Sequence, residues 1–95
     1  MSEGPPTLKC VIAWSNRRNL CSLVSNALED RIGWESLRRL GDEAVLVYDP
    51  APPGDIRDWV SPVLHPDESL LVLEFEKWSG RGPGIDTEWL MRRGH

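Results

Sequence analysis

Two amphipathic helix patterns, each lying between apolar strand patterns, constrain the fold of this chain more than any other feature. In both patterns the apolar side chains recur at intervals of three and four residues, which places them on one face of a helix. The first pattern covers residues 20–32 and the second residues 56–64. Their apolar residues are Leu20, Leu23, Val24, Ala27, Leu28 and Ile32, and Ile56, Trp59, Val60, Val63 and Leu64. Each helix is therefore expected to pack its apolar face against a sheet.

Four strands are predicted around these helices. In the first, Leu8–Trp14, the even-numbered residues are all apolar and the odd-numbered ones are mixed, so we expect the even face to be buried. Strands at residues 37–40 and Ala44–Tyr48 are predicted to form a hairpin, because Gly41-Asp42 suits a two-residue type II′ turn. The fourth, Leu70–Glu76, begins with an unbroken apolar run that is typical of a central strand covered on both faces.

Glycine, proline and aspartate predict where the helices end and begin. Gly33 follows the first helix pattern at the position of a C-terminal cap. The second helix is expected to start near Asp55, and Pro62 is expected to loosen its last turn, because proline lacks a backbone N–H. After a loop rich in glycine, Asp86 is expected to cap a short terminal helix, Thr87–Arg93.

The predicted order is strand, helix, strand, strand, helix, strand, and then a short C-terminal helix. This is the βαββαβ arrangement of the ferredoxin-like fold, an α+β sandwich in which two helices cover one face of a four-stranded antiparallel sheet. Residues 1–7 are expected to be a disordered lead-in, and residues 8–95 a single domain. Apolar residues on both sides of the last strand imply that the C-terminal helix, a second subunit or a partner covers the other face.

Charge and composition narrow the classes of function. The chain has 95 residues and a formal net charge of −4, which argues against a dedicated nucleic-acid binder. Its longest apolar run, Leu70–Leu73, is far shorter than a membrane helix, and its start lacks the features of a signal peptide. We therefore expect a cytoplasmic protein without membrane contact, in which Cys10 and Cys21 are free thiols.

Metal binding and catalysis have little support in the sequence. The two histidines, His65 and His95, and the widely spaced cysteines offer no zinc motif and no nucleophile with a nearby base. Asp49 with Asp55 or Asp58 is a candidate Mg²⁺ cluster at a strand-to-helix turn. Turn shaping and helix capping are the commoner roles of such carboxylates, so we expect no metal site.

Arginines and tryptophans supply the candidate binding residues. Arg17 and Arg18 lie in the loop entering the first helix, where backbone N–H groups favour a phosphate. In the glycine-rich loop, Trp78 is a candidate to stack on a base and Arg81 to contact a nucleic-acid backbone. Arginine contacts of this kind are also common on protein surfaces that bind no nucleic acid.

The five tryptophans divide into two groups. Trp14 and Trp59 fall on apolar faces and are expected in the core. Trp34, Trp78 and Trp89 lie in or beside loops and the terminal helix. These three either form a binding patch or fold the tail back onto the sheet.

Three segments together resemble a known family. They are the strand Ala44–Tyr48 with its following helix, the run Ile56–Val72, and a tail that contains Trp78–Gly82 and Glu88–Leu90. This pattern is similar to that of the SinR-like proteins, small ferredoxin-like proteins grouped with the CRISPR adaptation nucleases (the second CRISPR-associated protein family). The likeness covers about residues 44–93, and the first half of the chain matches in topology only.

The chain departs from those nucleases at the residues that hold their metal. The nucleases carry a Tyr-Asp pair at the end of the first strand, where the dimer brings its carboxylates together around a metal ion. This chain has Trp14-Ser15-Asn16 there, and amide and hydroxyl groups are poor ligands for a hard divalent cation. A Tyr48-Asp49 pair follows the third strand instead. The resemblance therefore implies the fold and a dimer.

We expect a non-catalytic association module, without cofactor, that forms a homodimer through the open sheet face or the Trp78–Trp89 region. By resemblance, its setting is CRISPR or another mobile-element defence function. Two alternatives stay open. One is a weak Mg²⁺-dependent nuclease that uses Asp49 across a dimer axis. The other is a small acidic accessory or inhibitor protein that docks on a larger complex.

Overall fold

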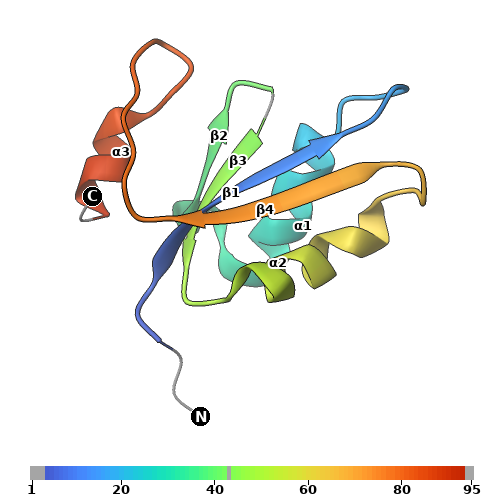
Figure 1. The fold of residues 1–95 in the computed structure, drawn as a ribbon, viewed down its shortest axis with the longest axis horizontal. Coiled ribbons are helices and arrows are strands. Elements are labelled where there is room, and N and C mark those ends of the chain that lie inside the picture. The colour runs from blue at the N-terminus through green and yellow to red at the C-terminus, as the bar shows by residue number, and fades with distance from the viewer. Residues whose placement is uncertain (1–3, 43, 94–95) are drawn as a thin grey trace.

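A four-stranded antiparallel sheet lies at the centre of the computed structural model, which describes residues 4–42 and 44–93 (Figure 1). The strand order is β2-β3-β1-β4, and all three neighbouring pairs are antiparallel. The strands are β1 (Thr7–Trp14), β2 (Leu37–Leu40), β3 (Ala44–Asp49) and β4 (Ser69–Phe75). The helices of the described chain are α1 (Cys21–Ile32), α2 (Pro53–Val60) and α3 (Thr87–Arg92). The predicted α+β class and the predicted order of elements are confirmed.

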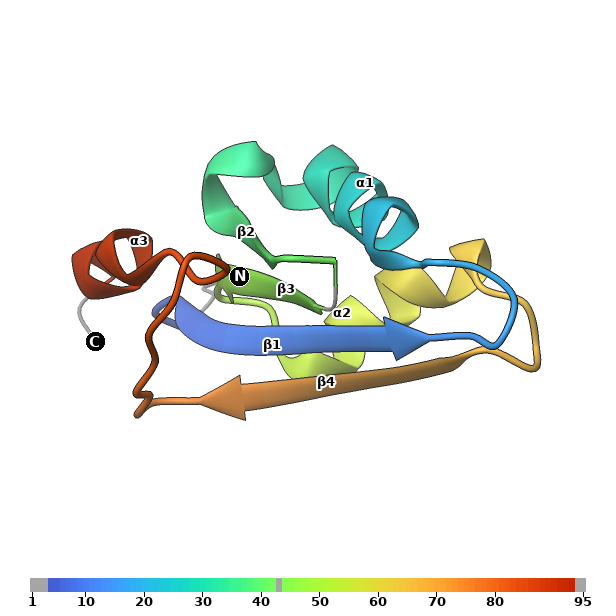
Figure 2. The same ribbon diagram turned by 90° about the horizontal axis from the view of Figure 1, so that it is seen from above.

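Helices α1 and α2 lie on the same side of the sheet (Figure 2). Helix α1 connects β1 to β2, and α2 connects β3 to β4. Both pack their predicted apolar stripes into one core with the sheet residues beneath them. The fully or nearly buried members of this core are Val11, Leu20, Cys21, Val24, Leu28, Leu37, Val45, Val47, Ala51, Ile56 and Val60.

Strand β1 presents to this core the face that we expected to be exposed. Val11 and the partly buried Ala13 pack beneath the helices, and Lys9 on the same face is fully buried. Trp14, expected in the core, lies on the opposite face and is 51% exposed. The expected burial of the even-numbered face is confirmed for Leu8, which is fully buried, and was wrong for Trp14. The odd-numbered face is buried as well, because main-chain carbonyls of Thr7 and Asp49 accept hydrogen bonds from the Lys9 ammonium group.

Helix α3 covers only one end of the second sheet face. Leu8 and Leu46 of the sheet form a second core cluster with Trp89 and Leu90 of α3. The partly buried residues around this cluster are Cys10, Leu40, Tyr48, Phe75, Trp78 and Ile85. The C-terminal helix is therefore part of the cover that the sequence required, and the rest of this face stays open.

Strand β4 is an edge strand, so its predicted central position was wrong. It pairs with β1 alone, and β1 and β3 occupy the centre of the sheet. Leu71 and Leu73 of β4 are 44% and 46% exposed. The apolar run of β4 therefore does not reflect burial on both faces.

Most predicted element ends are confirmed. Gly33 has a φ of 85°, and its N–H donates to Glu29 at the end of α1. Helix α2 begins at Pro53 instead of near Asp55, and before Pro62 it gives way to a 3-10 turn, Ser61–Val63.

The remaining ends differ in detail. The register pairs Leu40 with Ala44, which leaves three residues, 41–43, in the hairpin loop instead of two, and residue 43 lies outside the described residues. Thr7 belongs to β1, so the predicted lead-in is shorter, and its residues 1–3, like residues 94–95 of the predicted domain, lie outside the described residues. Within residues 4–42 and 44–93, no helix is long and apolar enough to cross a membrane.

Candidate functional site

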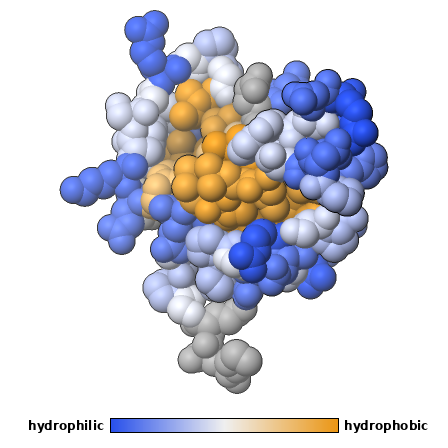
Figure 3. All heavy atoms as spheres, turned by 45° about the vertical axis from the view of Figure 1, so that its right-hand side comes forward, coloured by the Kyte–Doolittle hydropathy of each residue, from blue (hydrophilic) through white to orange (hydrophobic). Residues whose placement is uncertain are grey.

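The open part of the second sheet face carries a group of apolar side chains, which we call the β4 face: Ile12, Trp14, Leu71 and Leu73. Ile12 pairs directly with Leu71, and residues two positions apart share a face of the sheet, so the four side chains project together. Trp14, Leu71 and Leu73 are each about half exposed. With β4 at the front of the molecule, Figure 3 shows a continuous apolar area bordered by hydrophilic side chains.

The charge of β4 is directed away from the β4 face. Glu74 is the one charged residue of the strand. It lies on the helix side, where its Oε1 accepts a hydrogen bond from Thr7 Oγ1 (2.9 Å) and lies 4.0 Å from Lys9 Nζ. The β4 face is therefore apolar throughout.

Lys9 and Asp49 occupy the opposite side of the sheet, below the start of α2. Burial lowers the pKa of Lys9, and the nearby Glu74 and Asp49 carboxylates oppose that shift. The Asp49 carboxylate accepts the Ala51 N–H at 2.9 Å, which is the turn-shaping arrangement of an aspartate before a helix.

Two of the three candidate Mg²⁺ ligands, Asp49 and Asp58, have other partners. Asp58 pairs with Arg57 at 3.1 Å, and Asp49 holds the turn before α2. Over the described ranges, no group of three or more His, Cys, Asp or Glu side chains is placed to hold a metal ion.

Arg17 and Arg18 are paired with carboxylates of the turn before β4. Arg18 makes a two-pronged contact with Glu68, from Nε at 2.8 Å and Nη2 at 2.6 Å. Arg17 donates to Asp67 at 2.7 Å. The Glu68 side chain is inaccessible to solvent and also accepts the His65 N–H at 2.8 Å. Both candidate phosphate ligands thus join two loops of this chain.

The electrostatics of this cluster follow from the pairing. The hydrogen bond from Arg18 holds the pKa of the Glu68 carboxyl far below its usual range, against the opposing effect of desolvation. The same bond raises the pKa of Arg18. The Asn19 side chain already accepts the Cys21 N–H at 2.9 Å at the start of α1. A phosphate at this helix would have to displace Glu68 or Asn19.

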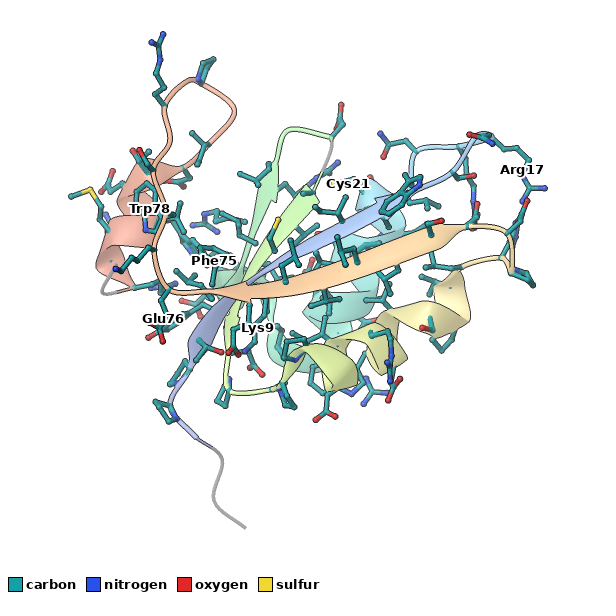
Figure 4. All side chains as sticks on the ribbon, in the orientation of Figure 1. Lys9, Arg17, Cys21, Phe75, Glu76 and Trp78 are labelled. Carbon is teal, nitrogen blue, oxygen red and sulfur yellow. The ribbon has the colours of Figure 1, made fainter. Side chains whose placement is uncertain are left out.

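The other candidate binding residues lie at the far end of the molecule, as the positions of Arg17 and Trp78 in Figure 4 make clear. Trp78 is half-buried beside α3 in the second core cluster. Arg81 is exposed in the loop that follows. Trp89 is only 3% exposed, and its Nε1 donates to the Glu35 carbonyl at 3.3 Å. Trp89 therefore anchors α3 and presents no surface to a partner.

The two thiols are packing groups. Cys10 and Cys21 are both free. Burial raises the pKa of Cys10, which makes its reactive thiolate form scarcer. Cys21 is buried, and its Sγ points toward the Ala44 carbonyl at 3.7 Å.

Sequence reasoning missed two sets of residues. It expected Trp14 in the core and β4 in the centre of the sheet, so it did not single out Trp14, Leu71 and Leu73 as an exposed group. It also did not group Arg38, Arg92 and Arg93, which the docking of α3 brings together beside Trp89. No local motif links residue 38 to residues 92 and 93, so no pattern in the sequence indicates this group.

Comparisons of the chain with protein-family models, curated proteins and solved structures find no match.

Proposed function

We propose that this protein is a non-catalytic association module, and that the partner covering the β4 face is a second copy of the same chain. One observation carries the proposal: Trp14, Leu71 and Leu73 are about half exposed on the part of the second sheet face that α3 leaves open. Exposed apolar surface of this kind is favourable to bury, and contiguous patches of it are typical of interaction sites.

The edge position of β4 supports a protein partner. An unpaired edge presents backbone N–H and C=O groups along its length, and proteins usually protect such edges with lysine, proline or a bulge. Strand β4 runs for seven residues, Ser69–Phe75, without lysine or proline. Its free edge and exposed leucines together suit a partner that lies along the strand.

Charge supports a second copy as that partner. Each chain carries a net charge of −4, so two copies repel each other overall, and a contact surface free of carboxylates is the one that adds no local repulsion. The β4 face is such a surface, because Glu74 is held on the opposite side of the sheet near Lys9. A two-fold pairing of β4 with itself about Val72 would place Leu71 opposite Leu73 of the second copy, and within Ser69–Phe75 no two charges would face each other.

We extend the proposal to the class of fold and the setting. We assign the arrangement to the ferredoxin-like βαββαβ fold. Two strand–helix–strand units, β1-α1-β2 and β3-α2-β4, support this assignment, because their strands alternate in the sheet order β2-β3-β1-β4. Its relation to the SinR-like proteins, and a place in CRISPR or other mobile-element defence, rest on the resemblance of residues 44–93. Two free cysteines support a cytosolic location.

The test is the mass of the protein in solution across a range of concentrations, measured by sedimentation equilibrium. We expect a reversible dimer of twice 10.8 kDa. Leu73→Lys should weaken dimerisation at least about tenfold, because it places a charge in the centre of the interface. Met91→Lys is the matched control, since Met91 is a 67% exposed apolar residue on α3, outside the β4 face.

Two outcomes would contradict the proposal. A monomer at every concentration would exclude the second copy and favour a different protein as the occupant of the β4 face. Equal weakening by Leu73→Lys and Met91→Lys would place the interface elsewhere. Circular dichroism of each variant should match that of the parent protein, because both positions are exposed.

A further inference from the structure

A hollow lies between α3 and the 3-10 turn Trp34–Ser36, on the side of the sheet away from β4. We call it the Trp34 hollow; its volume is about 260 Å³. Its lining residues are Trp34, Glu35, Arg38, Trp89, Arg92 and Arg93. They come from the 3-10 turn, β2, α3 and the residue that follows α3, so the hollow exists only because α3 docks here.

Trp34 is an exposed aromatic wall of this hollow. Its side chain is 63% exposed, and it belongs to neither of the two core clusters. An exposed indole offers a flat apolar surface on which a planar ring can stack. Trp34 therefore gives the hollow a means of holding an aromatic heterocycle.

Two of the three arginines of the hollow are held in place by Trp89. The guanidinium groups of Arg38 and Arg93 lie over its ring, 5.8 Å and 4.9 Å from the centroid. Arg93 Nη2 donates to the Glu35 carbonyl at 2.9 Å, the same oxygen that accepts the Trp89 indole N–H. Binding an anion here would require little further ordering of these side chains.

Arg93 also retains unused capacity to bind an anion. Its Nε–H is buried and meets no acceptor among the described residues. Over the same residues it forms no ion pair with a carboxylate. A buried donor without an acceptor is unusual in proteins, and here it belongs to a guanidinium group that lies over the rings of both Tyr48 and Trp89.

The charge of the hollow favours a compact anion over a long one. Its lining carries three guanidinium groups and one carboxylate, Glu35. Guanidinium groups bind phosphate oxygens in pairs of hydrogen bonds. Around the rim, Asp86 pairs with Arg38 at 3.2 Å and Glu88 pairs with Arg92, and these carboxylates would repel a continuous phosphate chain.

We propose that the Trp34 hollow binds a nucleoside phosphate, with its base stacked on Trp34 and its phosphate held first by Arg93, which has no carboxylate partner among the described residues. Arg38 and Arg92 contribute by exchanging Asp86 and Glu88 for the phosphate. This site is separate from the β4 face and does not depend on the proposed association. The arrangement combines a stacking surface with preoriented cations, which are the two requirements for recognising a nucleotide.

The experiment is a titration of the full chain with adenosine monophosphate at low salt, followed by nuclear magnetic resonance of the tryptophan indole and arginine Nε signals. We expect saturable shifts at Trp34, Trp89 and Arg93. Trp34→Ala should weaken binding about tenfold, as expected from the loss of one stacked base. Arg92→Gln should also weaken it, and both residues are exposed, so the fold is retained.

Matched controls and competing ligands complete the test. Trp14→Ala removes a 51% exposed indole on the β4 face, and Arg81→Gln removes an exposed arginine of the nearby loop; neither should change the affinity for the nucleotide. Adenosine and inorganic phosphate, given separately, should each bind more weakly than the nucleotide. No saturable shift at millimolar adenosine monophosphate would overturn the proposal, as would inorganic phosphate binding equally well. Tighter binding of a single-stranded oligonucleotide at these residues would replace it with a nucleic-acid site.

Discussion

The two edge strands of the sheet are built in opposite ways. Strand β2 is four residues long and carries Arg38 and Arg39, with the 3-10 turn and α3 beside it. Strand β4 is seven residues long and presents Leu71 and Leu73 to solvent. Short length and positive charge are common protections of a sheet edge, whereas a long apolar edge invites pairing. This difference is why we propose association at the β4 edge and a charged ligand beside the β2 edge.

The largest effect on stability should come from a change that loosens α3, which lies beside the β2 edge. Trp89→Ala deletes the buried ring that packs with Leu8 and Leu46 and lies under two guanidinium groups. We expect a loss of about 3–5 kcal/mol of unfolding free energy, as for other buried aromatic residues. Urea unfolding monitored by circular dichroism, at one fixed protein concentration, measures it.

Two companion variants make this test decisive. Trp34→Ala, at a 63% exposed position, should stay within about 0.5 kcal/mol of the parent protein. Trp89→Phe should lose less than Trp89→Ala, which keeps the comparison measurable if the alanine variant does not fold. A loss for Trp89→Ala as small as the one expected for Trp34→Ala would show that α3 does not depend on this ring.

The next largest effect on stability should come from Glu68, in the turn that leads into β4. The folded-state pKa of Glu68 lies below its ordinary value, chiefly because of the hydrogen bond from Arg18. Its stabilising contribution is therefore fully present above the pKa of the unfolded carboxyl and is lost as the pH falls through the folded-state pKa. Glu68→Gln should lower the melting temperature at pH 7, and the difference from the parent protein should shrink in acid.

Asp67→Asn is the control for Glu68. Asp67 pairs with Arg17, but its side chain is 66% exposed, and exposed ion pairs contribute little. Its melting temperature should therefore stay close to that of the parent protein at every pH. A constant difference between Glu68→Gln and the parent protein from pH 7 into acid would contradict the assigned role of the carboxylate.

A smaller effect should come from Lys9, on the face of β1 opposite the β4 face. Burial lowers its folded-state pKa, so between that value and the unfolded pKa the unfolded chain binds more protons. Stability should therefore rise with pH through this alkaline window. Lys9→Met should remove that rise, as measured by urea unfolding across the window, whereas Lys77→Met, at an exposed position, should retain it.

The smallest effect tests the β2 edge directly. Arg39→Val removes a positive charge from the β2 edge and puts an apolar residue there, as on β4. Because β2 is short, we expect only a slight increase in self-association by sedimentation. Arg81→Val makes the same change of charge in an exposed loop and should have no effect on association. A strong increase for Arg39→Val would mean that charge alone protects the β2 edge.

Local patterns predicted the elements because each depends on a few neighbouring residues. The three- and four-residue spacing predicted α1 and α2, Gly33 the end of α1, and Asp86 the cap of α3. The position of Pro62 predicted that α2 would loosen in its last turn. Each of these depends on backbone chemistry within one or two turns, so no distant contact was needed.

The sites were less predictable because they depend on contacts between distant segments. The sequence favoured Arg17 and Arg18 as anion ligands. In the structure the turn before β4 places Asp67 and Glu68 against them, although these residues lie some fifty positions away in the sequence. The sequence was equally consistent with Trp89 in a binding patch and with Trp89 packed against the sheet. Only the docking of α3 decided that it is buried.

The sequence by itself determined the order of strands and helices, and with it the α+β class, because apolar periodicity is a local property. Only the tertiary structure decided which face of β1 is buried, since main-chain carbonyls of Thr7 and Asp49 allow Lys9 into the interior. It also decided that β4 is an edge, because strand order depends on how the helical connections cross the sheet. An apolar strand looks the same in sequence whether the sheet or a partner covers it.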